Sequence, residues 1–175
     1  IRLTGYYGNT GYNVIENNVI NTTPGSGSTG ISISSSNNNI TNNTIYTGAS
    51  NGLDLNNLIS NNQVINNSLH TGSGSKAIVI AYQTDNNYFY GNLINSTGTG
   101  FWDYDGDNNL IVNSVIINAP SGDYRSGTGN NNTFVNSSFN TSNVIFDSTG
   151  DIKVQWYVDV NITNISGPLE NANVS

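Results

Sequence analysis

The stretch Asn61–Leu69 reads NNQVINNSL, and the stretch Asn37–Ile45, which begins 24 residues earlier, reads NNNITNNTI. This nine-residue unit occurs six times, starting at Tyr12, Asn37, Asn61, Asn86, Asn108 and Asn131. The starts lie 25, 24, 25, 22 and 23 residues apart. Such a period is typical of a solenoid, in which each repeat forms one coil that buries its apolar side against its neighbours.

Two positions of the unit are apolar or aromatic in every copy. The fourth position holds Ile15, Ile40, Val64, Phe89, Ile111 and Phe134, and the ninth holds Ile20, Ile45, Leu69, Ile94, Ile116 and Phe139. This spacing does not produce a helical stripe, but it suits two short strands around a bend. The segments Gly30–Ile33, Gly52–Leu55 and Ala77–Ile80 add a strand with a period of two. Each coil is therefore predicted to contain three short strands.

The second position of the unit is asparagine in all six copies. These residues are Asn13, Asn38, Asn62, Asn87, Asn109 and Asn132. Asn tolerates the left-handed backbone of a tight corner, and its amide can bond to an equivalent Asn in the next coil. Because buried polar groups need partners, we predict an Asn ladder at one corner. A chain that is merely polar would explain the 35 Asn residues, but not their register.

These features predict an all-β fold, a parallel β-helix of about six coils of 22–25 residues over residues 1–146. The coil pattern G-φ-x-φ…N-N-x-φ-x-N-x-x-φ, where φ is apolar, resembles that of right-handed parallel β-helix repeat proteins. These include pectate-lyase-like domains and the NosD-like repeats of bacterial and archaeal cell-surface proteins. The resemblance implies a right-handed solenoid, but it implies no single activity, because the fold carries lyases, hydrolases, epimerases, adhesins and inert spacers.

The pattern changes after Phe146, and residues 147–175 are expected to form a strand extension or the start of a β-sandwich. One long, half-buried strand is predicted from the alternation of Ile152, Val154, Trp156, Val158, Val160 and Ile162 with mostly polar residues. The following SGPLENANVS resembles the opening of Ig-like or carboxypeptidase-regulatory-like modules. Because neither end shows a capping helix, we expect this strand to complete a sheet, in its own chain or in a neighbouring copy.

Composition limits the classes of partner. Eleven acidic and four basic residues give a net charge of −7, which disfavours nucleic acid and anionic membranes, because phosphate binding needs Lys and Arg. The chain has no Cys, so it has no disulfide, and no apolar run long enough to span a membrane. The start without Met indicates a processed or excised piece. The neutral, hydrogen-bonding surface suits glycans, cations, neighbouring surface domains or other copies of the chain.

Eleven Asn-x-Ser/Thr sequons are candidates for N-glycosylation. They lie at Asn21, Asn39, Asn42, Asn66, Asn95, Asn131, Asn136, Asn140, Asn161, Asn164 and Asn173. A chain rich in Asn, Ser and Thr contains several sequons by chance, and those inside the repeat unit have a second interpretation as corner residues. Glycosylation would place the protein outside the cell, in a eukaryote or, as the repeat style suggests, an archaeon.

The densest candidate site is FWDYDGDNN, residues Phe101–Asn109. Asp103, Asp105 and Asp107 alternate around a Gly, and oxygen ligands at every second position can wrap Ca²⁺. The alternative interpretation is a solvated corner between strands.

Aromatic residues gather in the same part of the sequence. They are Tyr82, Tyr88, Tyr90, Trp102 and Tyr104. Such side chains form sugar-binding surfaces, but they also fill cores and subunit interfaces, and we favour packing or an interface here. Strand alternation is expected to turn Phe101 inward and Trp102 outward.

Few groups are available for catalysis. The basic side chains are Arg2, Lys76, Arg125 and Lys153, whereas lyases of this shape need a cation and a base. Asp54, Asp85 and the Asp103–Asp107 group could supply a glycosidase pair, but the hydrolase signatures of the fold are absent. His70, the sole His, has no partner for a nucleophilic triad.

We therefore predict a non-enzymatic extracellular structural protein, a β-helical building block of a cell-surface layer, sheath or filament. The alternative is a glycan-binding or lyase-like glycan-processing module with a Ca²⁺-assisted site at the Trp102–Asp107 corner.

Overall fold

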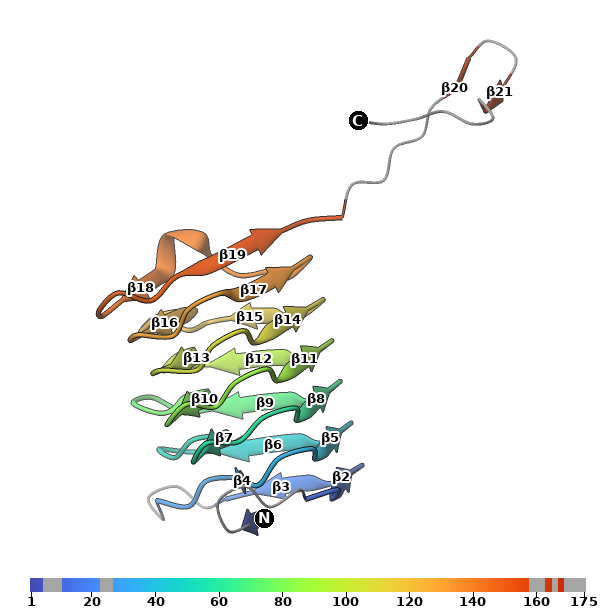
Figure 1. Cartoon of the computed structure of the whole chain (residues 1–175). Helices are drawn as coiled ribbons and strands as arrows, with labels where there is room; N and C mark the ends of the chain where they lie inside the picture. The colour runs from blue at the N-terminus through green and yellow to red at the C-terminus, as the bar shows by residue number, and fades with distance from the viewer. Residues whose placement is uncertain (5–10, 23–26, 158–162, 165–166, 169–175) are drawn as a thin grey trace.

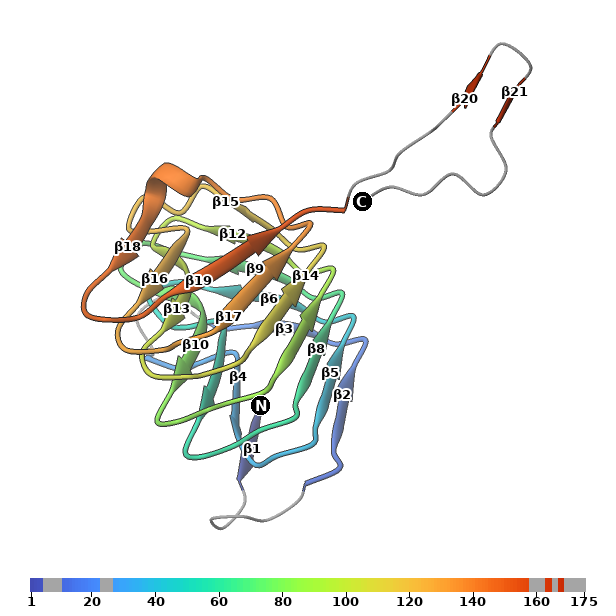
Figure 2. The same ribbon diagram turned by 45° about the horizontal axis from the view of Figure 1, so that its top comes forward.

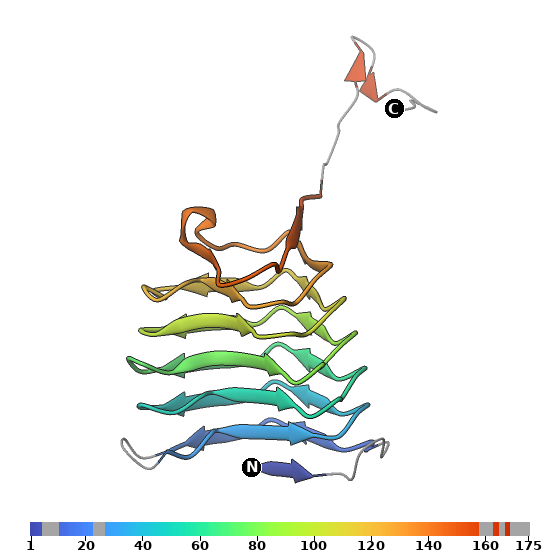
Figure 3. The same ribbon diagram turned by 60° about the vertical axis from the view of Figure 1, so that its left-hand side comes forward.

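A computed structural model of the chain describes residues 1–4, 11–22, 27–157, 163–164 and 167–168. Coils of three short strands lie one above another, so that each strand pairs with its equivalent in the next coil (Figures 1 and 3). Every pairing in the three sheets of the stack is parallel, as in Ile40↔Val64 and Phe89↔Ile111. The predicted parallel β-helix is thus confirmed.

The three sheets form the three sides of the coil (Figure 2). The first sheet contains, in order, β1 (Arg2–Thr4), β4 (Ile31–Ser34), β7 (Leu53–Asn56), β10 (Lys76–Ala81), β13 (Thr99–Asp103), β16 (Tyr124–Ser126) and β18 (Val144–Phe146). The second contains β2 (Val14–Glu16), β5 (Asn39–Thr41), β8 (Gln63–Ile65), β11 (Tyr88–Tyr90), β14 (Leu110–Val112), β17 (Asn132–Val135) and β19 (Ile152–Gln155). The third contains β3 (Val19–Asn21), β6 (Thr44–Thr47), β9 (Ser68–Thr71), β12 (Leu93–Ser96) and β15 (Val115–Ile117).

Three small elements lie outside these sheets. A 3-10 turn, η1 (Thr141–Asn143), precedes β18, and β20 (Thr163–Asn164) pairs antiparallel with β21 (Gly167–Pro168). Nothing helical in the described part of the chain has the length and hydropathy needed to span a membrane.

The core is a narrow apolar column inside the coils. Ile40, Val64, Phe89 and Phe134, from the fourth position of the unit, are fully buried, and the ninth position supplies the opposite wall. Burying each such side chain stabilises the fold by about 1.5–3 kcal/mol. Toward the C-terminal end the column becomes aromatic, with ring centroids of Phe89 and Phe101 5.1 Å apart. The repeat unit therefore places its apolar side chains where strand alternation predicts.

Asparagine at the second position forms a hydrogen-bonded ladder along the stack. The backbone N–H and Nδ2 of Asn38 both donate to Oδ1 of Asn62, each at 2.9 Å, and Asn62 donates in the same way to Asn87. The series runs from Asn13 to Asn132. Each carboxamide thus satisfies a buried N–H of the previous coil.

A second ladder lies at the seventh position, which the sequence analysis did not identify. Asn18, Asn43, Asn67 and Asn92 are linked in the same way, and Ser114 and Ser137 continue the series. The signal was present in the sequence, because this position is Asn in four copies of the unit and Ser in two.

The residue before each ladder position except Asn13 turns the corner with a left-handed backbone. The first and sixth positions of the unit have φ between 46° and 63°, at Asn37, Asn61, Asn86, Asn108 and Asn131, and at Asn17, Asn42, Asn66, Gly91, Asn113 and Asn136. Asn and Gly adopt this conformation at lowest cost. Each Asn-Asn pair is therefore one corner, in which the first residue bends the chain and the second bonds along the stack.

The C-terminal strand belongs to the β-helix itself. In β19, Ile152 pairs with Asn132 and Val154 with Phe134, so the second sheet continues past Phe146, where the sequence analysis placed the end of the β-helix. The strand ends at Gln155, and Trp156 and Tyr157 are exposed outside any strand, so the predicted strand was wrong at these two residues. Val158, Val160 and Ile162 lie outside the described residues, as does most of SGPLENANVS.

Candidate functional site

The three aspartates of the expected Ca²⁺ site do not converge. Asp103 lies on the same side of β13 as Phe101 and is fully buried, and its carboxylate accepts hydrogen bonds from Gly106 N (2.7 Å), Tyr124 Oη (3.0 Å) and Asn132 Nδ2. Asp107 accepts from Asn130 N at 2.7 Å. The described residues contain no group of three acidic, His or Cys side chains able to hold a metal ion. The prediction that Asp103, Asp105 and Asp107 together hold Ca²⁺ was therefore wrong, because their carboxylates do not form one cluster.

Asp103 instead ends the first ladder inside the core. Burial raises the pKa of its carboxyl to about 7, against the hydrogen bonds from Gly106 and Tyr124, which lower it. Burial and the neighbouring Asp103 carboxyl also raise the pKa of Tyr124. This acid is buried and accepts hydrogen bonds from core groups, so its protonation bears on stability.

The aromatic residues fall into two groups. Tyr88 and Tyr90 lie on β11 in the second sheet, with ring centroids 6.1 Å apart. Tyr82 follows β10, whereas Trp102 and Tyr104 lie in and just after β13, with centroids 6.0 Å apart. The structure therefore assembles only Tyr82, Trp102 and Tyr104 on the first sheet.

These three side chains line a groove on the outer face of the first sheet. The Trp102 groove has a volume of about 250 Å³ and is lined by Asp54, Asn56, Val79, Ala81, Tyr82, Trp102 and Tyr104. Asp54, Val79 and Trp102 are in register on β7, β10 and β13, so they form one row across the sheet. Period-two alternation turns this row outward, because Leu53, Ile78 and Phe101 fill the core.

Trp102 is not an open platform in this groove. The Lys76 ammonium lies over its ring, with Nζ 4.4 Å from the centroid, and Tyr104 contacts it edge to face. Its Nε1 is buried and has no hydrogen-bond partner among the described residues. This geometry supports the packing interpretation for Trp102 and leaves Tyr82 (63% exposed) and Tyr104 (52% exposed) as the accessible rings.

One carboxyl lies in the Trp102 groove. Asp54 accepts from Thr29 Oγ1 and Asn51 Nδ2, each at 3.0 Å. Burial raises its pKa, and these two hydrogen bonds and the charge of Lys76 lower it in part. Asp105 lines the neighbouring hollow, of about 300 Å³, together with Tyr82. Asp54 and Lys76 can thus provide an acceptor and a cation for a polar ligand.

The corners beside the groove carry unusual backbone. Leu58, Tyr82 and Gln83 have φ of 58°, 58° and 55°, a region that residues other than Gly, Asn and Asp rarely adopt. The carbonyl of Tyr82 accepts from the N–H of Leu58 at 2.8 Å, which links the two corners. Strain of this kind is concentrated at functional sites, so it marks this edge of the groove.

His70 lies in the third sheet, where its ring stacks on Tyr46 with centroids 4.8 Å apart. The sequence analysis missed this pair. Both residues follow the ninth position of the unit, so their register could have been read from the repeat.

The sequons lie on the outside of the coils where the structure describes them. Asn21, Asn42, Asn66, Asn131, Asn136 and Asn140 are exposed, and Asn39 and Asn95 are partly exposed. Asn164 lies in β20, and Asn161 and Asn173 lie outside the described residues. None of the described sequon residues belongs to either buried ladder.

A family model described as the right-handed β-helix region matches residues 4–139 of the chain. No curated protein and no solved structure matches it.

Proposed function

Because the chain belongs to the right-handed β-helix family, we propose that it is a non-catalytic structural module of an extracellular layer, sheath or filament. The observation that carries the proposal is the pair of ladders, from Asn13 to Asn132 and from Asn18 to Ser137, which link every coil to the next. Such networks stiffen a stack that has no disulfide. The style of the repeat supports assignment to the NosD-like repeats of archaeal cell-surface proteins, with an Ig-like or carboxypeptidase-regulatory-like module beginning near residue 166.

Self-assembly would use strand addition. β19 is the last strand of its sheet, so one of its edges has no partner strand in the described part of the chain. Ile152 lies in register with Asn132, so a copy stacked on this end would not extend the Asn ladder. Backbone pairing at the open edge is therefore the contact that we propose between copies.

Two measurements test the proposal. Immunogold labelling of the source cells should place the protein on the cell surface, and cytosolic labelling would refute the location. Light scattering should give a smaller particle when residues 147–175 are deleted. An unchanged particle size would refute strand addition by this segment.

A second candidate function is glycan binding or processing in the Trp102 groove. The observation that favours it is the combination of accessible Tyr82 and Tyr104 rings with Asp54 in the groove, Lys76 over the Trp102 ring, and strained corners beside them. Titration with uronate and neutral polysaccharides should show binding that Tyr82→Ala weakens and that Tyr90→Ala, on the second sheet, leaves unchanged. Release of new reducing ends would indicate an enzyme, whereas equal effects of both variants would exclude the groove.

A further inference from the structure

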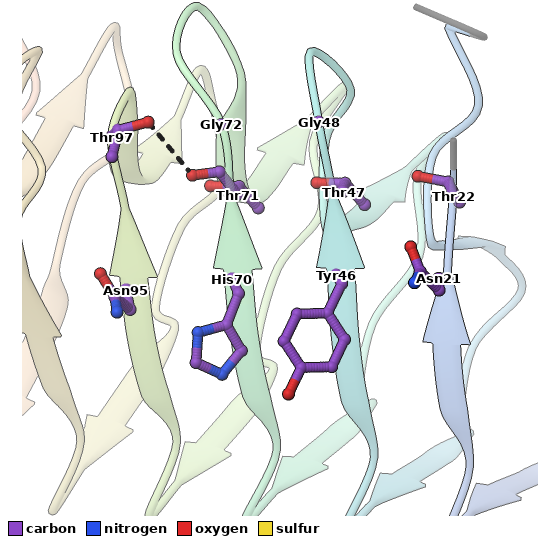
Figure 4. A pocket seen from close by; sticks show the side chains of 10 residues that line it. All are labelled: Asn21, Thr22, Tyr46, Thr47, Gly48, His70, Thr71, Gly72, Asn95 and Thr97. Carbon is purple, nitrogen blue, oxygen red and sulfur yellow. Dashed lines mark hydrogen bonds between the residues drawn. The ribbon is translucent and has the colours of Figure 1, made fainter. Parts of the chain in front are cut away.

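A second groove lies over the outer face of the third sheet (Figure 4). The Tyr46–His70 groove has a volume of about 450 Å³ and is lined by Asn21, Thr22, Tyr46, Thr47, Gly48, His70, Thr71, Gly72, Asn95 and Thr97. None of these residues is Asp, Glu, Lys or Arg. The groove is therefore suited to a neutral ligand that has hydroxyl groups and an apolar face.

The floor of the groove is a flat pair of rings. Tyr46 on β6 and His70 on β9 are in register, and their rings stack at 4.8 Å with an interplanar angle of 14°. A hydrogen bond of 2.9 Å between Ser68 Oγ and His70 Nε2 fixes the imidazole. The ring spacing equals the usual distance between neighbouring strands, so the backbone itself holds the pair.

A sequon asparagine lies on each side of this pair. Asn21 is in register with Tyr46, and Asn95 is in register with His70 (Figure 4). The Oδ1 of Asn95 accepts from Asn118 Nδ2, in the next coil, at 3.1 Å. The two polar atoms of a carboxamide point in different directions, so this bond leaves Asn95 Nδ2 on the side of His70. Among the described residues, no acceptor takes a hydrogen bond from this Nδ2.

We infer that Asn95 carries an N-linked glycan whose first sugar packs on the His70 face of the Tyr46–His70 pair. The inference rests on the proposed extracellular location. The donor is a polyprenyl-phosphate-linked sugar. The bond between its anomeric carbon and a phosphate oxygen breaks, a bond from that carbon to Asn95 Nδ2 forms, and Nδ2 loses one proton. The sugar is the neutral, half-apolar ligand that the groove suits.

The sequons at the corners lack this combination, and the sequon of Asn21, which also lies beside a ring, includes Thr23, outside the described residues. Asn42, Asn66, Asn131 and Asn136 are left-handed corner residues, and the Nδ2 of Asn136 already donates to Asn113 Oδ1 at 2.7 Å. In the Asn95 sequon, by contrast, the hydroxyl-bearing Thr97 is exposed, and the Asn lies beside a ring in a strand. Among the sequons that lie wholly within the described residues, Asn95 is therefore the position at which attachment and packing coincide.

The test uses the full chain, secreted from yeast and also made in a bacterium without N-glycosylation. Mass mapping of glycopeptides should find Asn95 occupied in the yeast protein. Thr97→Ala, which removes the sequon, should lower the Tm of the yeast protein by about 2–4 °C more than that of the bacterial protein, which loses only the 3.5 Å hydrogen bond from Thr97 Oγ1 to the carbonyl oxygen of Thr71 (Figure 4). This excess is the loss due to the glycan. In a His70→Ala background this loss should disappear, whereas in the control background Tyr90→Ala it should persist.

An unoccupied Asn95 overturns the inference, as does a loss of Tm that persists in His70→Ala. Binding of a free oligosaccharide by the bacterial protein, with Asn95 unoccupied in yeast, would assign the groove to an external ligand. These outcomes do not test the proposed surface role, which is tested separately by the location and assembly of the native protein.

Discussion

Replacing Asn62 by Ala removes one step of the first ladder. Oδ1 of Asn62 accepts from both the backbone N–H and Nδ2 of Asn38, each at 2.9 Å, and these two donors are buried. An unsatisfied buried donor costs about 1–3 kcal/mol, so the two together cost roughly 2–6 kcal/mol. We therefore expect Asn62→Ala to lower the free energy of unfolding by about 4 kcal/mol and the Tm by about 10 °C.

Asn61→Ala is the matched control, because it changes the same residue type one position earlier. Asn61 is exposed and has φ of 58°, so its replacement carries only the penalty of a left-handed Ala, roughly 1–2 kcal/mol. Urea unfolding followed by circular dichroism measures both variants. If Asn62→Ala costs no more than Asn61→Ala, the ladder does not stabilise the stack and the reasoning fails.

Three further predictions follow from the core, the coil contacts and the Trp102 groove. The pKa of Asp103 is about 7 in the folded chain and 3.8 in the unfolded chain, so between pH 4 and pH 7 the folded state holds more protons and Tm should fall as the pH rises. Asp103→Asn should reduce this dependence of Tm on pH. If the dependence is unchanged in the variant, another group causes it. A Cβ on Gly98 would lie 2.2 Å from the carbonyl oxygen of Ser75 in the adjacent coil, so Gly98→Ala should lower Tm by several degrees, whereas the exposed Ser73→Ala should change it by no more than about 2 °C. In a Trp156→Phe background, Lys76→Ala should increase acrylamide quenching of Trp102 fluorescence, because Lys76 covers the ring; equal quenching would show that it does not.

The fold could be predicted because the decisive information is local and repeated. The inward residues of the unit and the second-position asparagines recur in every coil, so each copy supports the same register. The same alternation that turns Phe101 inward also turns Asp103 inward, because the two are separated by one residue of a strand. The Ca²⁺ hypothesis treated Asp103 as a corner residue, although alternation predicts its burial; what the sequence could not reveal was that Tyr124 and Asn132 donate hydrogen bonds to it.

The outer faces were harder to predict because they depend on contacts between coils. The ring of Trp102 is covered by Lys76, which lies one coil earlier, and no property of FWDYDGDNN specifies that contact. Tyr46 and His70 meet because the intervening loops keep both in register across neighbouring strands. Pairings of this kind require the full register of the stack, whereas the second ladder required only a closer comparison of the six copies.

Negative-stain electron microscopy of the native protein, purified without tag or ligand, tests the proposed structural role most directly. The account predicts ordered filaments or sheets, in which copies join through the open edge at β19. Isolated short rods at every concentration would contradict assembly, and the Trp102 groove would then be the first place to search for a ligand.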